Sequence, residues 1–320
     1  MIGFVAERDG IFAACASFLA RLPVGGRALL LVALGLVAAV TAVLNLDTSV
    51  FFLTPVLLHL ARTRGLDERP FLYGAIFMSN SASLFLPGSN LTNLIVLHGE
   101  RVSGALFFAR LWPAAIASVI ATAGVLLVRF WRVLGNAGVA QTEHARPHLG
   151  IGVAAVVVGT VFVLGLRQPA LPVLAVGVIA VVAARVPRAH LREAVDARLL
   201  AGLFALAVAL GALGRSWGGP QALFDSFNRW ETAVGAAVAS VLVNNLPAAV
   251  LLSPTPPPHA RALLIGLNIG PNLAVTGSLS ALLWLRVARS LGASPSIRTF
   301  TSIGIVLMPI TLAAALIATS

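Results

Sequence analysis

Residues 45–55 read NLDTSVFFLTP, and residues 80–93 read NSASLFLPGSNLTN. These two stretches place amide, hydroxyl and carboxylate side chains and two prolines inside segments that are otherwise strongly apolar. Lipid offers no hydrogen-bond partner to such side chains or to an interrupted backbone, so both must face a cavity within the protein. The pattern predicts a solute-binding site at membrane depth.

The composition predicts a membrane protein with several spans. The chain is 58% hydrophobic and only 10% charged, with a mean hydropathy of +0.96, which excludes a soluble domain and a disordered chain. Uninterrupted apolar runs of about 20 residues, the length of a helical span, lie near 106–128, 148–166, 169–184, 197–214 and 299–318. The alternation typical of a membrane β-barrel is not visible, so the expected fold class is all-α and polytopic.

The net charge of +11 comes from arginine alone. The arginines occupy short gaps between apolar runs and do not form a basic face among aromatic residues, so no nucleic-acid partner is expected. The charge instead reports membrane topology. The single Cys15 excludes an internal disulfide and a site with several thiolate ligands.

Four longer segments are interrupted by polar residues, at 28–61, 71–98, 231–253 and 262–284. If 28–61 and 231–253 are re-entrant hairpins, and the other two cross as broken helices, the loops on one face hold 15 arginines. The loops on the other face then hold 5, which are Arg101, Arg167, Arg215, Arg229 and Arg261. If 28–61 instead crosses and 71–98 turns back, the two faces hold 12 and 8 arginines. The positive-inside rule therefore favours two hairpins and predicts an inner-membrane protein whose Arg-rich loops are cytoplasmic.

The two hairpins then open to opposite sides, which is the pattern of an inverted repeat. The spacing of matched motifs agrees, since Pro55 precedes Gly88 by 33 residues and Pro247 precedes Gly277 by 30. We expect a first transport repeat over 1–140, a connector with scaffold helices over 141–198, and a second, inverted repeat over 199–320.

Asp47 is the acidic residue that lies deepest within an apolar run. Apolar surroundings favour the protonated form of a carboxylate, so this group could gain and lose a proton during transport or coordinate a cation. The alternative is a structural cap at the start of the second hairpin arm. The two roles do not exclude each other.

Uncharged polar residues cluster with Asp47 at the predicted hairpin tips and helix breaks. They suit a neutral, hydroxyl-rich solute, and exposed helix N-termini there would also suit an oxyanion or carboxylate. Each could instead satisfy interrupted backbone. The candidate substrate-binding or ion-binding residues are Asn45, Asp47, Thr48, Ser49, Asn80, Ser83, Ser89, Asn90, Thr92, Asn93, Asn244, Asn245, Asn268, Asn272, Thr276 and Ser278.

Four segments resemble the arsenical pump membrane protein family (ArsB type) within the ion transporter superfamily. They are NLDTSVFFLTP at 45–55, SNSASLFLPGSNLTNLIVL at 79–97, VNNLPAAVLL at 243–252 and LNIGPNLAVTGSLSALLWLR at 267–286. The resemblance runs from about Glu7 to the C-terminus. Members usually carry further hydrophobic segments ahead of the position of Met1, so N-terminal scaffold helices are expected to be missing here. The first hairpin tip reads NLD, where arsenical pumps tend to have adjacent Asn and Asp. The resemblance therefore supports a role for Asn45 less strongly than a role for Asp47.

The resemblance implies a secondary transporter that exports arsenite or antimonite in exchange for protons. The same superfamily includes NhaD-type sodium/proton antiporters and sodium-coupled dicarboxylate and citrate carriers, which are the nearest alternatives. An inactive or partial membrane subunit is a further one, and an intramembrane enzyme is disfavoured because Asp47 alone is ionisable at the site. No cofactor, metal site or Walker A motif is expected, so any ATP dependence would need a separate ATPase subunit. The expected partners are the lipid bilayer, a small inorganic or carboxylate solute, protons or sodium, and in principle a second copy of the chain.

Overall fold

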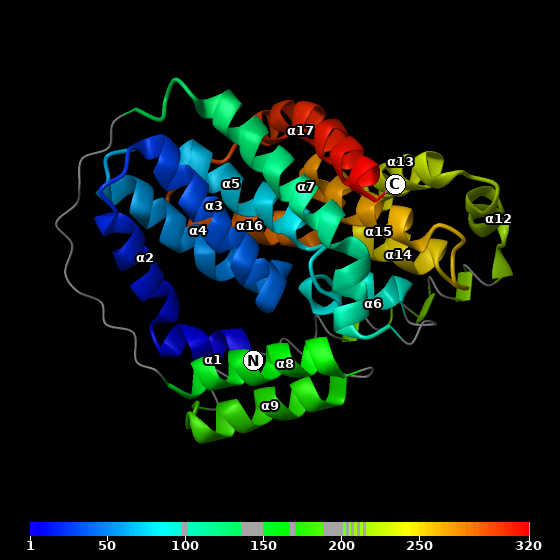
Figure 1. Ribbon diagram of the computed structural model, residues 1–320, viewed down its shortest axis with the longest axis horizontal. Helices are drawn as coiled ribbons and strands as arrows, with labels where there is room; N and C mark the ends of the chain where they lie inside the picture. Colours follow the sequence, from blue (N-terminus) through cyan, green and yellow to red (C-terminus); the bar gives the residue numbers. More distant parts are fainter. Residues whose placement is uncertain are drawn as a thin grey trace.

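Helices make up all the regular structure in the part of the chain that is described. The structure is a computed structural model that describes residues 1–97, 102–135, 150–166, 170–187 and 216–319, with a few positions between 201 and 213. Part of the predicted connector and most of the apolar run at 197–214 therefore lie outside the described residues. Figure 1 shows a main body of packed helices, with α1, α8 and α9 along one side of it.

The N-terminal half is built from a helical pair followed by a broken helix and a long helix. Its elements are α1 (Ile2–Arg8), α2 (Ile11–Arg21), α3 (Gly26–Val43), α4 (Leu46–Thr63), α5 (Glu68–Ala82), the 3₁₀ turn η1 (Pro87–Ser89), α6 (Leu91–Val96) and α7 (Gly104–Phe130). The α3–α4 pair turns at Leu44 and Asn45, and the α5–α6 segment breaks around Pro87. Proline and polar residues interrupt the helical hydrogen bonding at these points.

The C-terminal half repeats the same order of elements. It contains α13 (Arg229–Val243), α14 (Asn245–Leu252), α15 (Ala260–Ile269), the 3₁₀ turns η2 (Gly270–Asn272) and η3 (Val275–Gly277), α16 (Leu279–Ser290) and α17 (Ile297–Ala318). Between the halves lie α8 (Ile151–Gly165), α9 (Ala170–Ala183) and α12 (Gly219–Asp225). The predicted interruptions in all four segments are therefore present.

Contacts between helices are matched across the two halves. Helix α3 packs on α5 as α13 packs on α15, and α5 packs on α7 as α15 packs on α17. Between the halves, α4 packs against α16, α6 against α14, and α7 along α17. The second arm of each pair thus lies against the second part of the other half's broken helix.

The core is apolar and continuous between the halves. Trp284 of α16 is fully buried between Tyr73 and Phe300, and its indole Nε1 donates a hydrogen bond of 2.8 Å to the Leu72 carbonyl. Gly304 of α17 allows a close approach, because an added Cβ would overlap the Asn272 carbonyl of η2. A separate small cluster joins α1 to α8 and α9 through Val5, Ala155 and Ala180.

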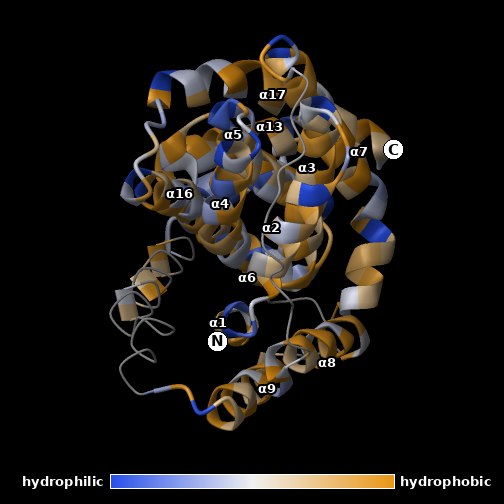
Figure 2. Ribbon diagram, turned by 90° about the vertical axis from the view of Figure 1, so that its left-hand side faces the viewer, coloured by the Kyte–Doolittle hydropathy of each residue, from blue (hydrophilic) through white to orange (hydrophobic). Residues whose placement is uncertain are grey.

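Three helices of the described chain are long and apolar enough to cross a membrane: α3, α7 and α17. Helices α8 and α9 are apolar but shorter. Figure 2 shows hydrophobic residues over most of the helices, and Ile120, Val128 and Ile305 are large apolar side chains that are well exposed. Such surfaces suit lipid, and the chain is an all-helical membrane protein with several apolar spans. Because α3 has 18 residues, its length alone permits a full crossing, so the re-entrant topology stays a prediction.

Candidate functional site

Polar residues cap the four helices that begin at the interruptions. The Asn45 side chain accepts from the Thr48 amide at 2.7 Å and starts α4, and Asn244 accepts from the Leu246 amide at 3.3 Å and starts α14. In the broken segments, Asn90 caps α6 and Ser278 caps α16. These caps satisfy backbone amides that a helix start leaves without partners.

Asn244 also sets the direction of the second turn. Its φ of 77° lies in the left-handed region that few residues other than glycine and asparagine adopt. Its Nδ2 donates a hydrogen bond of 3.0 Å to the Thr276 carbonyl, which ties the turn to the second broken segment. Asn244 is therefore a structural residue in this conformation.

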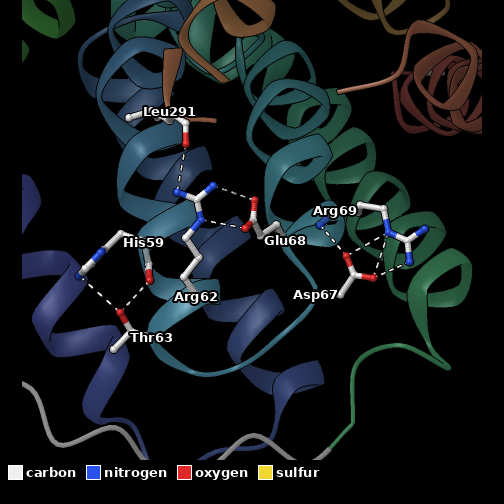
Figure 3. Close-up of polar contacts among 7 residues, drawn as sticks. All are labelled: His59, Arg62, Thr63, Asp67, Glu68, Arg69 and Leu291. Carbon is white, nitrogen blue, oxygen red and sulfur yellow. Dashed lines mark hydrogen bonds and ion pairs between the residues drawn. The ribbon is translucent and has the colours of Figure 1, made fainter. Parts of the chain in front are cut away.

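Helices α4 and α16 run side by side in the same direction. Near their C-terminal ends, Arg62 donates hydrogen bonds to the Leu291 carbonyl at 3.1 Å and to Glu68 at 2.8 Å, as Figure 3 shows. At the same end of the molecule, Arg69 binds Asp67, and this hydrogen bond lowers the pKa of the Asp67 carboxyl. These contacts join the two helices near their C-terminal ends.

The starts of α4 and α16 bring Asp47 to Ser280. The Ser280 hydroxyl donates a hydrogen bond of 2.5 Å to Asp47 Oδ1, although the two residues are 233 positions apart in the chain. Hydrogen bonds to a carboxylate are short and strong. Ser280 was not among the predicted site residues, because nothing in the local sequence indicates a partner so far away.

A cavity of about 350 Å³ opens beside this pair. The Asp47 side chain is exposed to this cavity, Asn245 reaches it from the start of α14, and Asn90 reaches it from the cap of α6. We call it the Asp47 cavity. It is lined by Asp47, Asn90, Leu91, Asn245, Leu246, Leu279, Ser280, Leu282, Leu283 and Arg286.

The electrostatics of the Asp47 cavity are mixed. Helices α4, α14 and α16 all begin at it, so their partial positive ends attract oxygen atoms of a solute. Asp47 supplies the opposite charge, and Arg286 supplies a guanidinium further along α16. The sequence placed Arg286 with the loop arginines, whereas the structure places it in a helix that lines the cavity. The arrangement can bind a small solute rich in oxygen and can exchange a proton or cation at Asp47.

The predicted residues of the two broken segments meet in one amide network. Asn268 accepts hydrogen bonds from Ser83 at 2.5 Å and Asn90 at 2.7 Å, and it donates to Asn93 Oδ1 and to the Leu264 carbonyl, both at 2.8 Å. Asn80 donates to Asn272 Oδ1 at 2.8 Å. Apart from Asn90, these residues are fully buried and do not reach the Asp47 cavity.

Ser81, which the sequence also places in the first broken segment, and Thr122, which the sequence analysis did not select, extend this network. The hydroxyls of Ser81 and Thr122 lie 2.7 Å apart, and Ser81 also lies 3.5 Å from the Asn272 amide. Thr122 belongs to α7, so the network connects the broken segments to a long helix. Its position within an apolar run gave no local indication of this role.

The remaining predicted residues have separate surroundings. Thr48 faces α1, where a Cβ added to Gly3 would overlap its methyl group. Ser49 lies 3.2 Å from the Ser79 hydroxyl, and Ser89 donates to the Ala42 carbonyl at 3.0 Å. Thr276 contributes its backbone carbonyl to Asn244. In this conformation none of these four side chains lines the Asp47 cavity.

Some buried oxygens near the breaks have no hydrogen-bond partner within the described residues. They are Asn80 Oδ1, Thr92 Oγ1 and Thr41 Oγ1. Within the same residues, no group of three or more His, Cys, Asp or Glu side chains could hold a metal ion. The buried polar atoms that remain available to a solute or an ion at the breaks are therefore amide and hydroxyl oxygens.

Comparisons with known proteins agree with a membrane-transport fold. The sequence pattern of the family described as "Citrate transporter" (CitMHS) matches residues 1–271. The silicon efflux transporter LSI3 of Oryza sativa subsp. japonica is 28% identical over 145 residues, which is 45% of this chain and 30% of that protein's length. The crystal structure of the Alcanivorax borkumensis YdaH transporter aligns with a TM-score of 0.58 at 15% identity and covers 99% of this chain and 82% of its own. At that identity the likeness shows the fold alone.

Proposed function

Since the chain belongs to the citrate transporter family, we propose that it is a secondary transporter that carries a small, oxygen-rich solute through the Asp47 cavity. One observation carries this proposal. The starts of α4, α14 and α16, which come from both halves of the chain, lie at one cavity together with the Asp47 carboxylate. Helix starts that point at a solute near the membrane midplane are a recurrent design of transporter sites.

The matched halves support alternating access. The loops at residues 20–24 and the end of α4 lie together, because Arg64 donates hydrogen bonds to the Ala20, Leu22 and Val24 carbonyls. Both ends of the α3–α4 pair thus lie at one end of the molecule. The start of α13 and the loop before α15 line a different cavity with residues from α7 and α17. This arrangement supports two hairpins that enter from opposite sides, with the Arg-rich end in the cytoplasm.

The charge of Asp47 links the cargo to the coupling ion. A neutral solute with hydroxyl groups can donate a hydrogen bond to the carboxylate, and a proton on Asp47 removes that acceptor. The proton and the solute then compete for the Asp47 carboxylate, which gives exchange of solute for protons. A carboxylate solute is instead repelled by ionised Asp47, and a proton or sodium ion there removes the repulsion, which gives symport.

For the cargo we propose arsenite or antimonite, exported in exchange for protons. The uncharged amides and hydroxyl of Asn90, Asn245 and Ser280 suit a neutral molecule with several O–H groups. The relative is named as a silicon efflux transporter, which supports the outward transport of an inorganic cargo.

Uptake of a carboxylate such as citrate is the second candidate. Arg286 and the three helix starts favour an anion, and the family's description names citrate. The sign of coupling separates the two candidates, because exchange and symport respond oppositely to the same proton gradient.

The test uses purified protein in proteoliposomes with an imposed pH gradient. Arsenite that moves against the proton flow, with no citrate flux, supports the first candidate, and citrate that moves with protons or sodium supports the second. Asp225→Asn is the control for substitution of Asp47, because Asp225 is an exposed carboxylate that does not line the cavity. Folded protein that moves none of these solutes would sink the proposal and favour an inactive or partial subunit.

A further inference from the structure

A wide cavity of about 890 Å³ opens at the end of the molecule where α7 ends and α17 begins. These two helices run side by side in Figure 1. The lining comes from Arg69 at the start of α5, Thr299 at the start of α17 and residues 128–133 at the end of α7. We call it the interfacial cavity. It shares no lining residue with the Asp47 cavity.

The interfacial cavity lies where a spanning helix leaves the membrane. Helix α7 is apolar enough to span, and its 27 residues reach about 40 Å, which exceeds a hydrocarbon core of about 30 Å. Arg129 in its last turn and the exposed Trp131 directly after it mark this end as the one at headgroup depth, where tryptophan is enriched. The cavity is therefore within reach of lipid headgroups.

Two of the three arginines at the interfacial cavity have no carboxylate partner within the described residues. They are Arg129 and Arg132, which are both exposed and form no ion pair in that part of the chain. The third, Arg69, is bound to Asp67 by hydrogen bonds of 3.0 Å, so this pair adds no net charge (Figure 3). Arg129 also lies 5.5 Å from the centre of the Phe130 ring, a cation–π contact that does not use its N–H donors.

Exposed apolar side chains alternate with these two arginines along the chain. Val128 precedes Arg129 and is 76% exposed, and Trp131 and Val133 lie on either side of Arg132 and are exposed as well. A free inorganic anion gains nothing from apolar surface, whereas an acyl chain is stabilised by contact with it. The combination of guanidinium and apolar groups therefore fits the phosphate of a phospholipid better than a free anion.

Contacts with the start of α3 hold the turn that carries Arg132. Arg27 donates a hydrogen bond of 3.2 Å to the Trp131 carbonyl, and its guanidinium lies 3.7 Å from the centre of the indole ring. Further on, the Gly135 carbonyl accepts a hydrogen bond of 3.1 Å from the Gly26 amide. The chain after the lining residues is thus directed to α3, and the wall of the cavity is fixed by residues that the structure describes.

We propose that the interfacial cavity binds an anionic phospholipid, with Arg129 and Arg132 at its phosphate and an acyl chain against Val128 and Trp131. Arginine presents N–H donors in a planar fork that matches phosphate oxygens. Basic groups at the cytoplasmic surface of a membrane attract anionic lipids, and this arginine-rich end is the one expected in the cytoplasm. Binding does not depend on the identity of the transported solute, so it can be tested without a flux assay.

The experiment measures lipid binding to the full chain in phosphatidylcholine nanodiscs with a rising fraction of phosphatidylglycerol. Native mass spectra count the retained phosphatidylglycerol, and the thermal unfolding midpoint is recorded in parallel. Wild-type protein is expected to retain this lipid and to be stabilised by it. The double variant Arg129→Gln, Arg132→Gln should bind it at least about tenfold more weakly, because two charges that attract the headgroup are lost. Both side chains are exposed, so the core packing is unchanged in this variant.

Arg289→Gln is the matched control, since Arg289 is an exposed arginine near the end of α16 that does not line the interfacial cavity. Replacement of Arg129 and Arg132 by lysine keeps both charges and should retain most of the affinity. The proposal is overturned if wild-type protein shows no preference for phosphatidylglycerol, or if the control weakens binding as much as the double glutamine variant does. Equal stabilisation by inorganic phosphate in pure phosphatidylcholine nanodiscs would also overturn it, because the occupant would then be a free anion.

Discussion

At the scale of the residue, the Asp47 carboxylate is held by one hydroxyl and faces a cavity. Ser280 donates to Oδ1 at 2.5 Å, and the caps at Asn45 and Ser278 fix the two helix starts that carry the pair. Asp47 is in the first turn of α4, where a negative charge interacts favourably with the helix dipole. The geometry is therefore compatible with a structural role of Asp47 and with its proposed role in coupling.

Asp47→Asn separates these roles. The amide keeps the size of the side chain and can still hydrogen-bond Ser280, but it can neither bind a proton nor carry charge. We expect flux driven by a proton gradient to fall at least about tenfold, in keeping with the loss of an essential proton-transfer group. Proteoliposome flux measures this, and a folded variant that keeps full gradient-driven flux would reduce Asp47 to a cap.

At the scale of the element, the two broken helices are joined by side chains rather than by backbone pairing. Asn268 uses its whole hydrogen-bonding capacity, with two bonds accepted and two donated. Its partners Ser83, Asn90 and Asn93 come from the other broken segment or its cap. The interruptions in the two halves therefore stabilise each other.

Asn268→Ala should destabilise the protein strongly. It leaves the donors of Ser83 and Asn90 and the Asn93 oxygen without this partner in a buried place, and each such group costs about 1–3 kcal/mol. We expect a total loss of about 3 kcal/mol or more, visible as a fall of several degrees in the thermal unfolding midpoint in detergent. Ser290→Ala, which removes an exposed hydroxyl, is the control. Equal midpoints for the two variants would contradict the network's importance.

Gly304→Ala and Gly124→Ala should have opposite effects. A Cβ at Gly304 would overlap the Asn272 carbonyl and push α17 away from η2, at a cost of about 1–3 kcal/mol. A Cβ at Gly124 of α7 meets open space, so alanine there should stabilise the helix by up to about 1 kcal/mol. Thermal unfolding of both variants checks the pair, and a stabilising Gly304→Ala would show that α17 does not pack as described.

At the scale of the whole molecule, the two halves present their loops at two ends. Ser290 is the last residue of α16, at the end of the molecule that carries Arg62 and Leu291, and Thr255 lies in the loop between α14 and α15. Both side chains are exposed. On the predicted topology the first faces the cytoplasm and the second the opposite side.

Labelling of single cysteines tests that topology. In a Cys15→Ala background, a membrane-impermeant maleimide should label Thr255→Cys in intact cells and Ser290→Cys only in everted vesicles. The native chain contains Cys15 alone, so the background needs one substitution. Labelling of both positions from the same side would rule out the inverted arrangement.

Much of the helical architecture could be predicted from the sequence, because proline, glycine and amides inside apolar runs mark interruptions without knowledge of the fold. The interruptions at Asn45, Pro87, Asn244 and Gly270 were predicted on that basis. The hydrogen-bond partner of Asp47 could not be, since Ser280 reaches Asp47, and Arg286 reaches the same cavity, only through the packing of α4 on α16. The motifs indicated the correct superfamily, and the family is that of the citrate transporters; the arsenical cargo stays a proposal.

The three hydrogen bonds that join Asn268 to Ser83, Asn90 and Asn93 limit the motions open to this protein. A movement that drew the two halves apart would break all three at once in a medium without water to replace them. A displacement of both broken helices as one body would break none. The cargo would then travel together with the walls that enclose it, while the surrounding helices stay behind.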